Sequence, residues 1–533
     1  MQTSYDEIPY MGRVHAQTHP QRLAIIAKLF NFPAPKIETA RILELGCGDG
    51  SNLLNIAYQL PQSTCIGIDA SSLHIERGQG MIEAAKLSNA KLVAENLTSI
   101  DESWGTFDYI ICHGVFSWVP IEVQQKIFSI CKNLLSETGI AYISYNTYPG
   151  WHMYNMFRGM MQYHAGKMEH TEDKIAQAKA ILQFTTLHTL DSSSPYGQFL
   201  GNNIEFMSRL TDEYLFHEYL ETNNHPLYFN QFVEQAAQHS LQYLGDTEFH
   251  TMTPLNYPEE TKATLEAISP SIFELEQYMD FLRCRRFRCS LLIRDHHELK
   301  REVPLDPFLD LRFRFRAFAQ SLIDIEPTER PEQPLSDEEH DIETTLHAIS
   351  INDANIEDQD LTAADVDLYK SALELLNDCY PQSLHFSEII AQCSTTLSRV
   401  IEQEEQIDLC KLFQSLFIKN LIHLELIAPT FVTEISERPI LNPLARYQLT
   451  YQAVVNSALH DMILVSDPWL QQLGQRLTGE HTLPELIETL KELQDQEILE
   501  TPFETPPEDP DKELLVLLKK ALQIFADHGA LIG

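Results

Sequence analysis

Short apolar runs alternate with amphipathic segments through the first 150 residues of the chain. Each run is rich in Ile, Leu, Val and aromatic residues and predicts a buried strand, while the segments between the runs have the periodicity of helices. This alternation is typical of a doubly wound α/β fold, in which helices cover a parallel sheet. Strands are expected at Ile42–Leu45, Thr64–Ile68, Lys91–Ala94, Phe107–Cys112 and Gly139–Ser144.

A glycine-rich turn follows the first predicted strand and leads into an amphipathic segment. The strand carries Glu44, and Gly46, Gly48 and Gly50 come directly after it. Glycine lets the backbone adopt positive φ and lets a ligand lie close to the main chain. A turn of this kind between a strand and a helix predicts a nucleotide-binding loop, although the glycines alone also fit a dinucleotide binder.

The second predicted strand ends at Asp69, where an acid can accept hydrogen bonds from both ribose hydroxyls of a bound nucleoside. The nicotinamide-binding spacing G-x-G-x-x-G would require glycine at position 51 or 53, and the chain has Ser51 and Leu53 there. The sequence therefore favours a nucleoside-containing ligand other than a nicotinamide dinucleotide.

The charge balance narrows the set of possible partners. The chain has 77 acidic residues against 38 Lys and Arg, a formal net charge of −39. A phosphate backbone would be repelled, so we expect no nucleic-acid substrate, whereas a basic or lysine-bearing protein would be attracted. The acidity could equally serve solubility alone.

Cysteine usage and hydropathy predict a cytoplasmic protein. Nine scattered cysteines without a C-x-x-C pair indicate reduced thiols, and no metal site is expected. The first residues lack the basic and apolar regions of a signal peptide, and no apolar run is long enough for a membrane span, so no membrane insertion is expected.

A chain of 533 residues suggests about three or four domains. The apolar runs stop after the fifth strand, give way to helical periodicity at 175–190 and 202–220, and resume as a terminal hairpin whose second strand is expected to be antiparallel. Beyond the hairpin, an acidic Pro-containing linker at 326–360 precedes a set of helices. A strand-like stretch at 454–465 and a helix that begins with a capping box of Thr482 and Glu485 follow, and this final set of short elements suggests a winged helix. The expected divisions are 1–151 (sheet domain, first part), 152–222 (helical insertion), 223–300 (sheet domain, second part), 301–430 (linker and helical middle domain) and 431–533 (winged-helix-like domain).

Several motifs resemble a single protein family. Glu44-Leu-Gly-Cys-Gly-Asp-Gly50 is similar to motif I of the Rossmann-type (class I) methyltransferases that use S-adenosylmethionine (SAM). With Tyr5–Tyr10, Gln17–Pro20, Phe107–Pro120 and Ser144–His152, it resembles the bacterial methyltransferases that carry a methyltransferase regulatory domain. That family includes the rickettsial protein-lysine methyltransferases acting on outer-membrane proteins. The resemblance covers residues 5–300 closely and 301–533 loosely, and implies a seven-stranded methyltransferase fold with a middle domain and a C-terminal winged helix.

The resemblance implies SAM as the cofactor, bound at the carboxyl ends of the strands. Tyr10 and His19 precede the first strand and are expected in a segment that closes over SAM, or in an arm on the sheet edge. Asn96 stands where the family usually has an Asp that contacts the adenine amino group. The expected cofactor residues are Tyr10, His19, Glu44, Gly46, Cys47, Gly48, Gly50, Asn52, Asp69, Ala70, Asn96, Leu97, His113 and Gly114.

The loops after the fourth and fifth strands are expected to form the walls of the acceptor pocket. Their aromatic residues could form a channel for an alkylammonium group, and Asn146 could hold an amine through its carbonyl oxygen. Trp118 could instead simply secure the following helix. The expected catalytic residues are Trp118, Tyr145, Asn146, Tyr148 and Trp151.

The leading functional hypothesis is methyl transfer from SAM to lysine side chains of a protein substrate. The alternatives are a small-molecule methyltransferase and a SAM-binding regulator without turnover. Residues 152–222 are expected to mediate dimerisation, or else to form a substrate lid. Winged helices often bind DNA, but this acidic one is expected to bind protein or to pack on its own catalytic domain.

Overall fold

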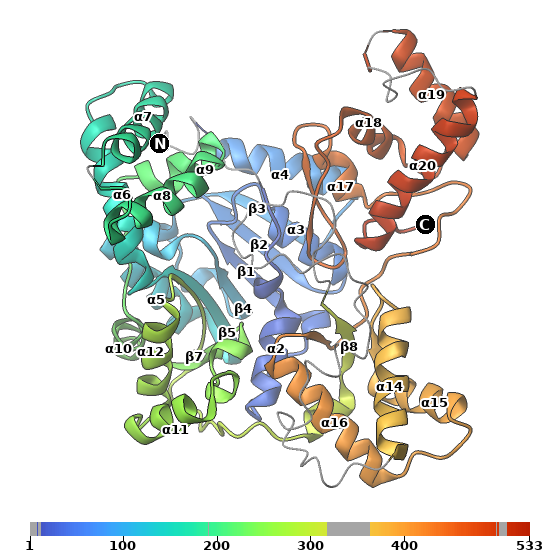
Figure 1. Ribbon diagram of the computed structural model, residues 1–533, viewed down its shortest axis with the longest axis horizontal. Coiled ribbons are helices and arrows are strands. Elements are labelled where there is room, and N and C mark those ends of the chain that lie inside the picture. Colours follow the sequence, from blue (N-terminus) through green and yellow to red (C-terminus); the bar gives the residue numbers. More distant parts are fainter. Residues whose placement is uncertain (1–7, 9–11, 190, 317–362, 497, 500–508) are drawn as a thin grey trace.

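The computed structural model describes residues 8, 12–189, 191–316, 363–496, 498–499 and 509–533 (Figure 1). Its central sheet contains β1 (Arg41–Leu45), β2 (Thr64–Asp69), β3 (Ala90–Ala94), β4 (Phe107–Cys112), β5 (Leu135–Asn146), β6 (Leu241–Asp246) and β7 (Phe287–Arg294). The strand order is β3-β2-β1-β4-β5-β7-β6, parallel from β3 to β5 and antiparallel where β7 pairs with β5 and β6. The expected seven-stranded methyltransferase fold with its terminal hairpin is confirmed.

The apolar runs become strands because they occupy the middle of this sheet. β1 pairs with β2 on one side and with β4 on the other, so both of its faces are covered by protein. Parallel strands end at a common edge, which places the turn after Leu45 beside the end of β2 at Asp69.

One boundary differs from the prediction in a way that affects the site. β5 was expected to end at Ser144, but it continues through Tyr145 and Asn146, which pair with Arg288 and Phe287 of β7. Tyr145 and Asn146 are therefore strand residues and not loop residues, and their side chains point to opposite faces of the sheet.

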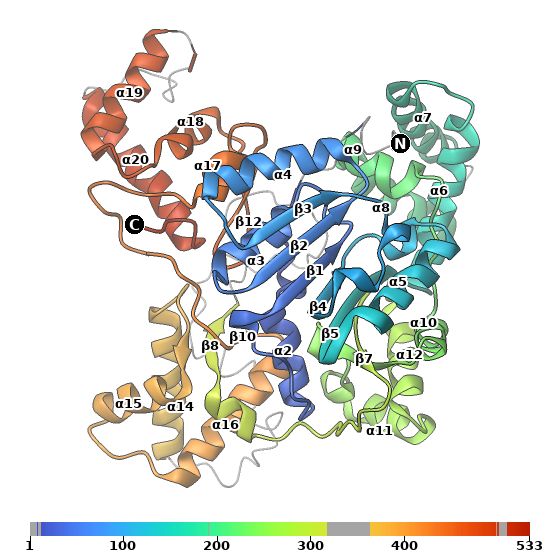
Figure 2. The same ribbon diagram turned by 180° about the vertical axis from the view of Figure 1, so that it is seen from behind.

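Helices of the sheet domain flank the strands on both sides (Figures 1 and 2). They are α2 (Pro20–Leu29), α3 (Ser51–Gln59), α4 (Ser72–Ala85), α5 (Ile121–Leu134), α10 (Phe229–Gln238), α11 (Glu259–Ile268) and α12 (Ile272–Arg283).

The expected insertion forms a helical cluster with its own apolar core, beyond one edge of the sheet domain (Figure 1). The elements are α6 (Gly150–Ala165), α7 (Thr171–His188), α8 (Pro195–Ser208), α9 (Asp212–Leu215) and the π-helical turn η6 (Phe216–Leu220). The predicted helical stretch 175–190 corresponds to α7, whereas the stretch 202–220 is divided among three elements, α8, α9 and η6. An additional helix, α6, begins at Gly150 and precedes them.

The middle domain packs against the sheet domain. Its small antiparallel sheet has the order β10-β8-β9, and its buried apolar residues are continuous with those of the central sheet. The acidic stretch 326–360 lies outside the described residues. The elements are β8 (Arg312–Phe315), α14 (Ala363–Asp378), β9 (Leu384–His385), α15 (Phe386–Thr396), α16 (Gln403–Ile418) and β10 (Ile422–Glu425).

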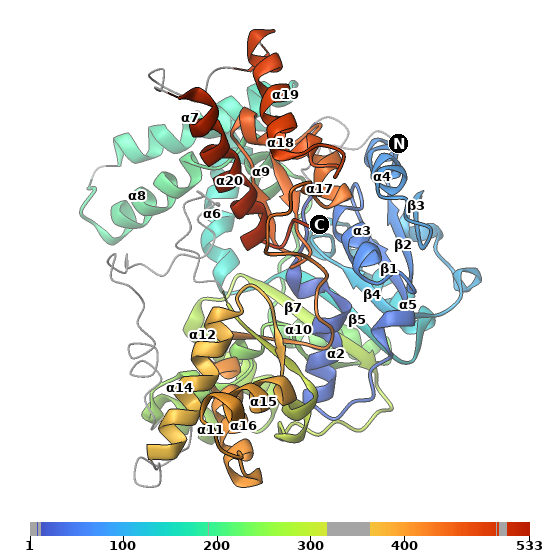
Figure 3. The ribbon, with the colours of Figure 1, turned by 90° about the vertical axis from the view of Figure 1, so that its right-hand side faces the viewer.

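The C-terminal domain has a separate apolar core and lies beside α3 and α4 (Figure 3). The capping box of Thr482 and Glu485 is present at the start of α19. The stretch 454–465 was expected to be a single strand-like segment, but it is a hairpin, because the chain reverses at residues 457–461. The elements are α17 (Pro443–Gln448), β11 (Val454–Asn456), β12 (Met462–Leu464), α18 (Pro468–Arg476), α19 (Leu483–Asp495) and α20 (Pro510–Asp527).

Within the described part of the chain, no helix combines the length and the apolar character needed to cross a membrane. All nine cysteines are free thiols.

Candidate functional site

A cavity of about 860 Å³ opens at the carboxyl edge of β1, β2, β4 and β5. The cavity brings together segments that are far apart in the sequence: the glycine loop, the N-terminal segment, the loop after β4, the end of β5, the start of β7 and the helical insertion. The edge of the sheet is the position expected for a nucleoside-containing ligand in this fold. Of the predicted cofactor residues, those lining the cavity are Glu44, Gly46, Cys47, Gly48, Asn52, Asp69, Ala70, Asn96, Leu97, His113 and Gly114.

The glycine loop forms one wall of the cavity because its backbone conformation requires glycine. Gly46 and Gly48 have φ of +72° and +56°, and a side chain at Gly46 would collide with Val115. Asp69 fixes the loop by accepting hydrogen bonds of 2.9 Å from the backbone N–H groups of Gly48 and Ser71. The predicted position of Asp69 at the end of the second strand is confirmed.

Glu44 presents a buried carboxylate to the cavity. Its Oε1 accepts a hydrogen bond of 2.7 Å from Asn52 Nδ2, whereas Oε2 has no partner among the described residues. Burial raises the pKa of Glu44 to about 8, and the hydrogen bond from Asn52 opposes this shift. A buried carboxylate oxygen without a partner suits a cationic ligand group, such as the amino group in the methionine part of SAM.

Asn96 lines the cavity and also caps a short helical turn. Its Oδ1 accepts from both the backbone N–H and the hydroxyl of Thr98, at 2.9 and 2.8 Å. The contact of Asn96 with adenine stays a prediction.

The N-terminal segment contributes His15 to the cavity wall, a residue that the sequence did not indicate. The rings of His15 and His113 lie 3.8 Å apart, and the backbone N–H of His15 donates to Asn52 Oδ1. Burial lowers the pKa of His15 to about 4 and that of His113 well below its usual value, so both rings are neutral at pH 7. These uncharged rings form a wall that could pack against a ligand.

Two predicted cofactor residues lie outside the cavity lining. His19 caps α2, where its Nδ1 accepts from the N–H of Gln21, and its ring contacts His460. Gly50 is the cap residue of α3 and faces Leu92. Tyr10 is outside the described residues.

The acceptor side of the cavity contains three of the five predicted catalytic residues. Trp118 and Trp151 meet edge to face with their ring centroids 5.9 Å apart. Asn146 lines the same cavity at the end of β5, and its Nδ2 donates to Asn224 Oδ1 at 3.0 Å.

Tyr145 and Tyr148 do not line the cavity, so their expected place against the transferred methyl group is wrong. Tyr145 is buried and stacks on Phe232 of α10 at 4.0 Å, because its strand position turns the ring away from the face that Asn146 occupies. Tyr148 stacks on His152 at 4.0 Å.

The insertion supplies much of the remaining lining, and the sequence did not point to these residues individually. Glu218 faces the cavity on η6; desolvation raises the pKa of its carboxyl group to about 7, opposed by the positive charges of Arg286 and Arg158. Arg286 at the start of β7 donates to Tyr154 at 2.6 Å. The richness of this stretch in Tyr and His was a signal, but its spacing did not reveal which residues face the site. The lining residues from 152–222 are Tyr154, Phe206, Tyr214, His217, Glu218, Tyr219 and Glu221.

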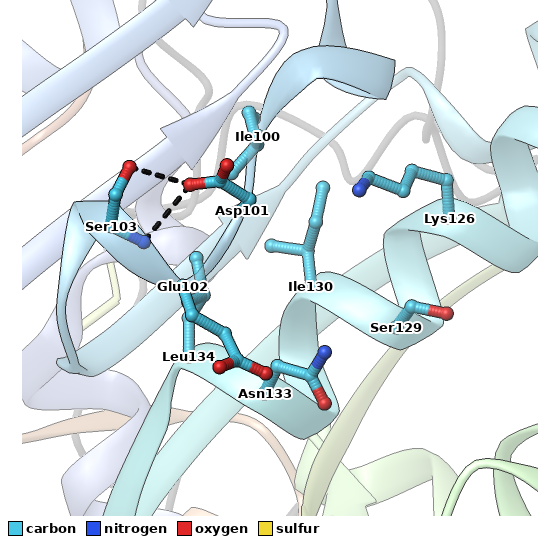
Figure 4. Close-up of a pocket in the computed structure, with 9 residues that line it drawn as sticks. All are labelled: Ile100, Asp101, Glu102, Ser103, Lys126, Ser129, Ile130, Asn133 and Leu134. Carbon is cyan, nitrogen blue, oxygen red and sulfur yellow. Dashed lines mark hydrogen bonds between the residues drawn. The ribbon is translucent and has the colours of Figure 1, made fainter.

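A second depression lies between α5 and the turn that follows β3 (Figure 4). Its Asp101 carboxylate accepts from the backbone N–H and hydroxyl of Ser103 and so caps a short helical turn. This depression shares no residue with the large cavity, which remains the candidate site.

Three family models match the chain. One described as a methyltransferase domain matches residues 37–196, one described as a predicted methyltransferase regulatory domain matches 211–294, and one described as the PKMT C-terminal winged helix domain matches 437–530. Together they span the sheet domain, the insertion and the C-terminal domain.

Related proteins come from Rickettsia. One uncharacterized protein of Rickettsia prowazekii is 41% identical over 302 residues, which are 57% of this chain and 54% of the relative. A second uncharacterized protein of the same organism is 44% identical over 241 residues, which are 45% of this chain and 96% of that relative. The structure of PKMT2 from Rickettsia typhi is 30% identical and covers 98% of this chain and 100% of PKMT2, with a TM-score of 0.80. The structure of PKMT2 in complex with AdoHcy matches this chain with a TM-score of 0.81.

The fold and the cavity define a SAM-dependent methyltransferase of the Rossmann-like class, with SAM as the cofactor. Within that class, the chain belongs to the family of methyltransferases that combine a regulatory domain with a PKMT winged-helix domain, and it resembles PKMT2 over nearly its whole length.

Proposed function

We propose that this enzyme transfers methyl groups from SAM to lysine side chains of a protein substrate. The observation that carries the proposal is the composition of the cavity beyond the glycine loop, where Trp118, Trp151 and Asn146 face the same space as Glu218. Aromatic faces and a carboxylate are the groups that attract an alkylammonium ion. The likeness to PKMT2 over the full chain supports the same choice.

SAM supplies an electrophilic methyl group on a sulfonium centre, so the protein must present a neutral amine in line with it. Lysine has a reference pKa of about 10.4, and removal from water lowers that pKa. Glu218 would draw the ammonium into the cavity while ionised, and the aromatic walls would then exclude water. Asn146 would orient the amine, because its side chain occupies the end of β5 at the sheet edge.

The test is to incubate the protein with methyl-labelled SAM and a bacterial lysate, and then to separate macromolecules from metabolites. We expect label in protein, recovered as methyl-lysine after hydrolysis. Glu218→Gln should reduce incorporation, whereas Glu205→Gln, an acid on the exposed face of α8, should not. Label confined to small molecules would replace the proposal with a metabolite methyltransferase, and binding without any transfer would indicate a regulator.

The proposed partners include a second copy of the chain and no nucleic acid. Exposed aromatic and aliphatic side chains lie on α6 and α7 of the insertion, with Tyr163 83%, Phe184 59% and Leu187 79% exposed. Such side chains favour self-association when they share a surface. Sedimentation of Phe184→Ser and Leu187→Ser variants beside the wild type tests this directly, since a wild-type monomer at micromolar concentration contradicts it. The free thiols support a reducing, cytoplasmic location.

A further inference from the structure

The C-terminal domain contacts the helix that begins at the glycine loop. The β11–β12 hairpin and the end of α17 lie over the first two turns of α3, about 400 residues away in the sequence (Figure 2). The hydrogen bonds across this interface include Gln448 Nε2 to Ser51 Oγ (3.1 Å), Tyr451 Oη to Asp49 Oδ2 (3.4 Å), Asn456 Nδ2 to Ser51 O (3.4 Å), His460 Nε2 to Asn52 Oδ1 (2.9 Å) and Asn55 Nδ2 to Ser457 O (2.9 Å).

The interface is polar, and its centre is buried. Asn52 and Asn55 on α3 are 4% and 0% exposed, and His460 is 4% exposed. A buried polar group that loses its partner has a free-energy cost, so these contacts define one relative position of the two domains.

His460 is held in one tautomer at the turn of the hairpin. Its backbone has φ of +60°, and its Nδ1 lies 3.1 Å from Asn55 Nδ2, which can only donate. Nδ1 therefore accepts, the ring proton is on Nε2, and Nε2 donates to Asn52 Oδ1.

Asn52 carries this contact to the cavity. Its Oδ1 accepts from His460 Nε2 and from the backbone N–H of His15, and the Thr18 hydroxyl lies within hydrogen-bond distance of the same amide. The Asn52 Nδ2 donates to Glu44 Oε1 at 2.7 Å, and both Asn52 and Glu44 line the cavity. We propose that His460 is a positioning residue for SAM: together with His15 and Thr18 it fixes the Asn52 amide and thereby the Glu44 carboxylate, so the winged-helix domain completes the cofactor site of its own catalytic domain. The inference rests on SAM binding in this cavity and is independent of the methyl acceptor.

The experiment measures AdoHcy affinity of the full-length protein by calorimetry. We expect His460→Ala to weaken binding by at least about tenfold. His460→Gln should remain within about threefold of the wild type, because the Gln amide can donate to Asn52 as Nε2 does. Tyr447→Ala is the matched control: Tyr447 packs against Gly80 of α4 in the same interface and does not line the cavity. It should lower the melting temperature and leave the affinity unchanged.

A double-mutant cycle separates positioning from general loosening of the interface. If His460 acts through Asn52, His460→Ala should cause no further loss of affinity in an Asn52→Ala background. The proposal is overturned if the two losses add, if His460→Ala and Tyr447→Ala weaken AdoHcy equally, or if His460→Ala binds as the wild type does. Should His460→Ala fail to fold, His460→Asn replaces it: its shorter side chain is expected to fall short of Asn52, and wild-type affinity in that variant counts against the proposal. None of these readouts depends on the identity of the methyl acceptor.

Discussion

The backbone N–H of Gly48 donates a hydrogen bond of 2.9 Å to Oδ2 of Asp69. This bond joins the glycine loop after β1 to the end of β2, and the second Asp69 oxygen accepts from Ser71 at the same distance. Each carboxylate oxygen can accept more than one hydrogen bond, so Asp69 can hold the loop and still bind ribose hydroxyls. The acid therefore has two roles, one in shaping the loop and one toward the ligand.

Replacing Asp69 by Ala should weaken AdoHcy binding by roughly 1.5–3 kcal/mol, the range for hydrogen bonds to a charged group. Calorimetry measures the affinity, and circular dichroism checks that the fold is retained. Asp101→Ala is a matched control, because the Asp101 carboxylate also accepts from the backbone N–H two residues further on but lies away from the cavity. Equal affinity in Asp69→Ala and the wild type would remove Asp69 from the cofactor site.

The raised pKa of Glu44 predicts that cofactor affinity depends on pH. Without ligand, burial places the pKa of Glu44 at about 8, so most of the carboxyl is protonated at pH 6 and the carboxylate forms as the pH approaches 8. The amino group of AdoHcy is cationic over this range and favours the carboxylate. Affinity should therefore rise between pH 6 and 8, by at most about tenfold per pH unit.

Calorimetry at several pH values tests this dependence, with Glu44→Gln as the control. The Gln amide does not titrate, so the AdoHcy affinity of Glu44→Gln should be lower than that of the wild type at pH 8 and should change little with pH. Wild-type protein should also release a proton on binding at pH 7, which appears as a dependence of the measured heat on the buffer. A flat wild-type profile would show that Glu44 does not pair with the amino group.

The glycine loop, the parallel strands and the helix caps could be predicted because each is encoded by neighbouring residues. Gly46, Gly48 and Asp69 stand at the ends of apolar runs. Those runs become strands inside the sheet, where their apolar side chains are buried on both faces. Thr482 and Glu485 are three residues apart, and their capping box forms as expected.

The parts that could not be predicted depend on contacts between distant segments. Tyr145 was expected at the site because β5 appeared to end one residue earlier, and only its pairing with Arg288 of β7 shows the strand continuing. Glu218 reaches the cavity through the packing of the insertion, and His460 through a contact with α3. No local pattern in the sequence marks either residue.

Asn146 and Tyr145 should respond differently to substitution, because they occupy opposite faces of β5. Asn146→Ala removes a cavity side chain and should lower turnover roughly 10–100-fold, the scale of a misplaced acceptor, with little change in AdoHcy affinity. Tyr145→Phe removes only a hydroxyl that lies 3.3 Å from Ser290, so turnover should stay within about threefold of the wild type. Initial rates with a protein that the wild-type enzyme methylates measure both effects. Normal turnover by Asn146→Ala would place the acceptor elsewhere in the cavity.

Arg288 should be essential for the stability of the regulatory region. Its guanidinium is fully buried in β7, bonded to both oxygens of Asp280 at 2.7 and 2.9 Å and to Glu276 at 2.9 Å, and stacked over Phe229 at 3.7 Å. Arg288→Met would keep much of the apolar volume, leave the buried Glu276 without a cation and leave Asp280 with only Arg285, at 3.7 Å. Such a break costs roughly 3–5 kcal/mol, which denaturant midpoints and hydrogen exchange in α12 would detect.

The pH dependence of that loss identifies its cause. Burial raises the pKa of Glu276, and the charge of Arg288 opposes the shift. Without Arg288 the folded-state pKa of Glu276 rises further above its unfolded value of about 4.3. The contribution of protonated Glu276 to the free energy of unfolding is then fully present at pH values below the unfolded-state pKa. It is lost as the pH rises through the folded-state pKa. The difference between Arg288→Met and wild type should therefore be smaller at pH 5 than at pH 8. Arg209→Met, in an exposed pair with Glu205, should change stability by at most about 1 kcal/mol at either pH. A loss in Arg288→Met that is equal at both pH values would attribute it to packing against Phe229, and not to the uncompensated carboxylates.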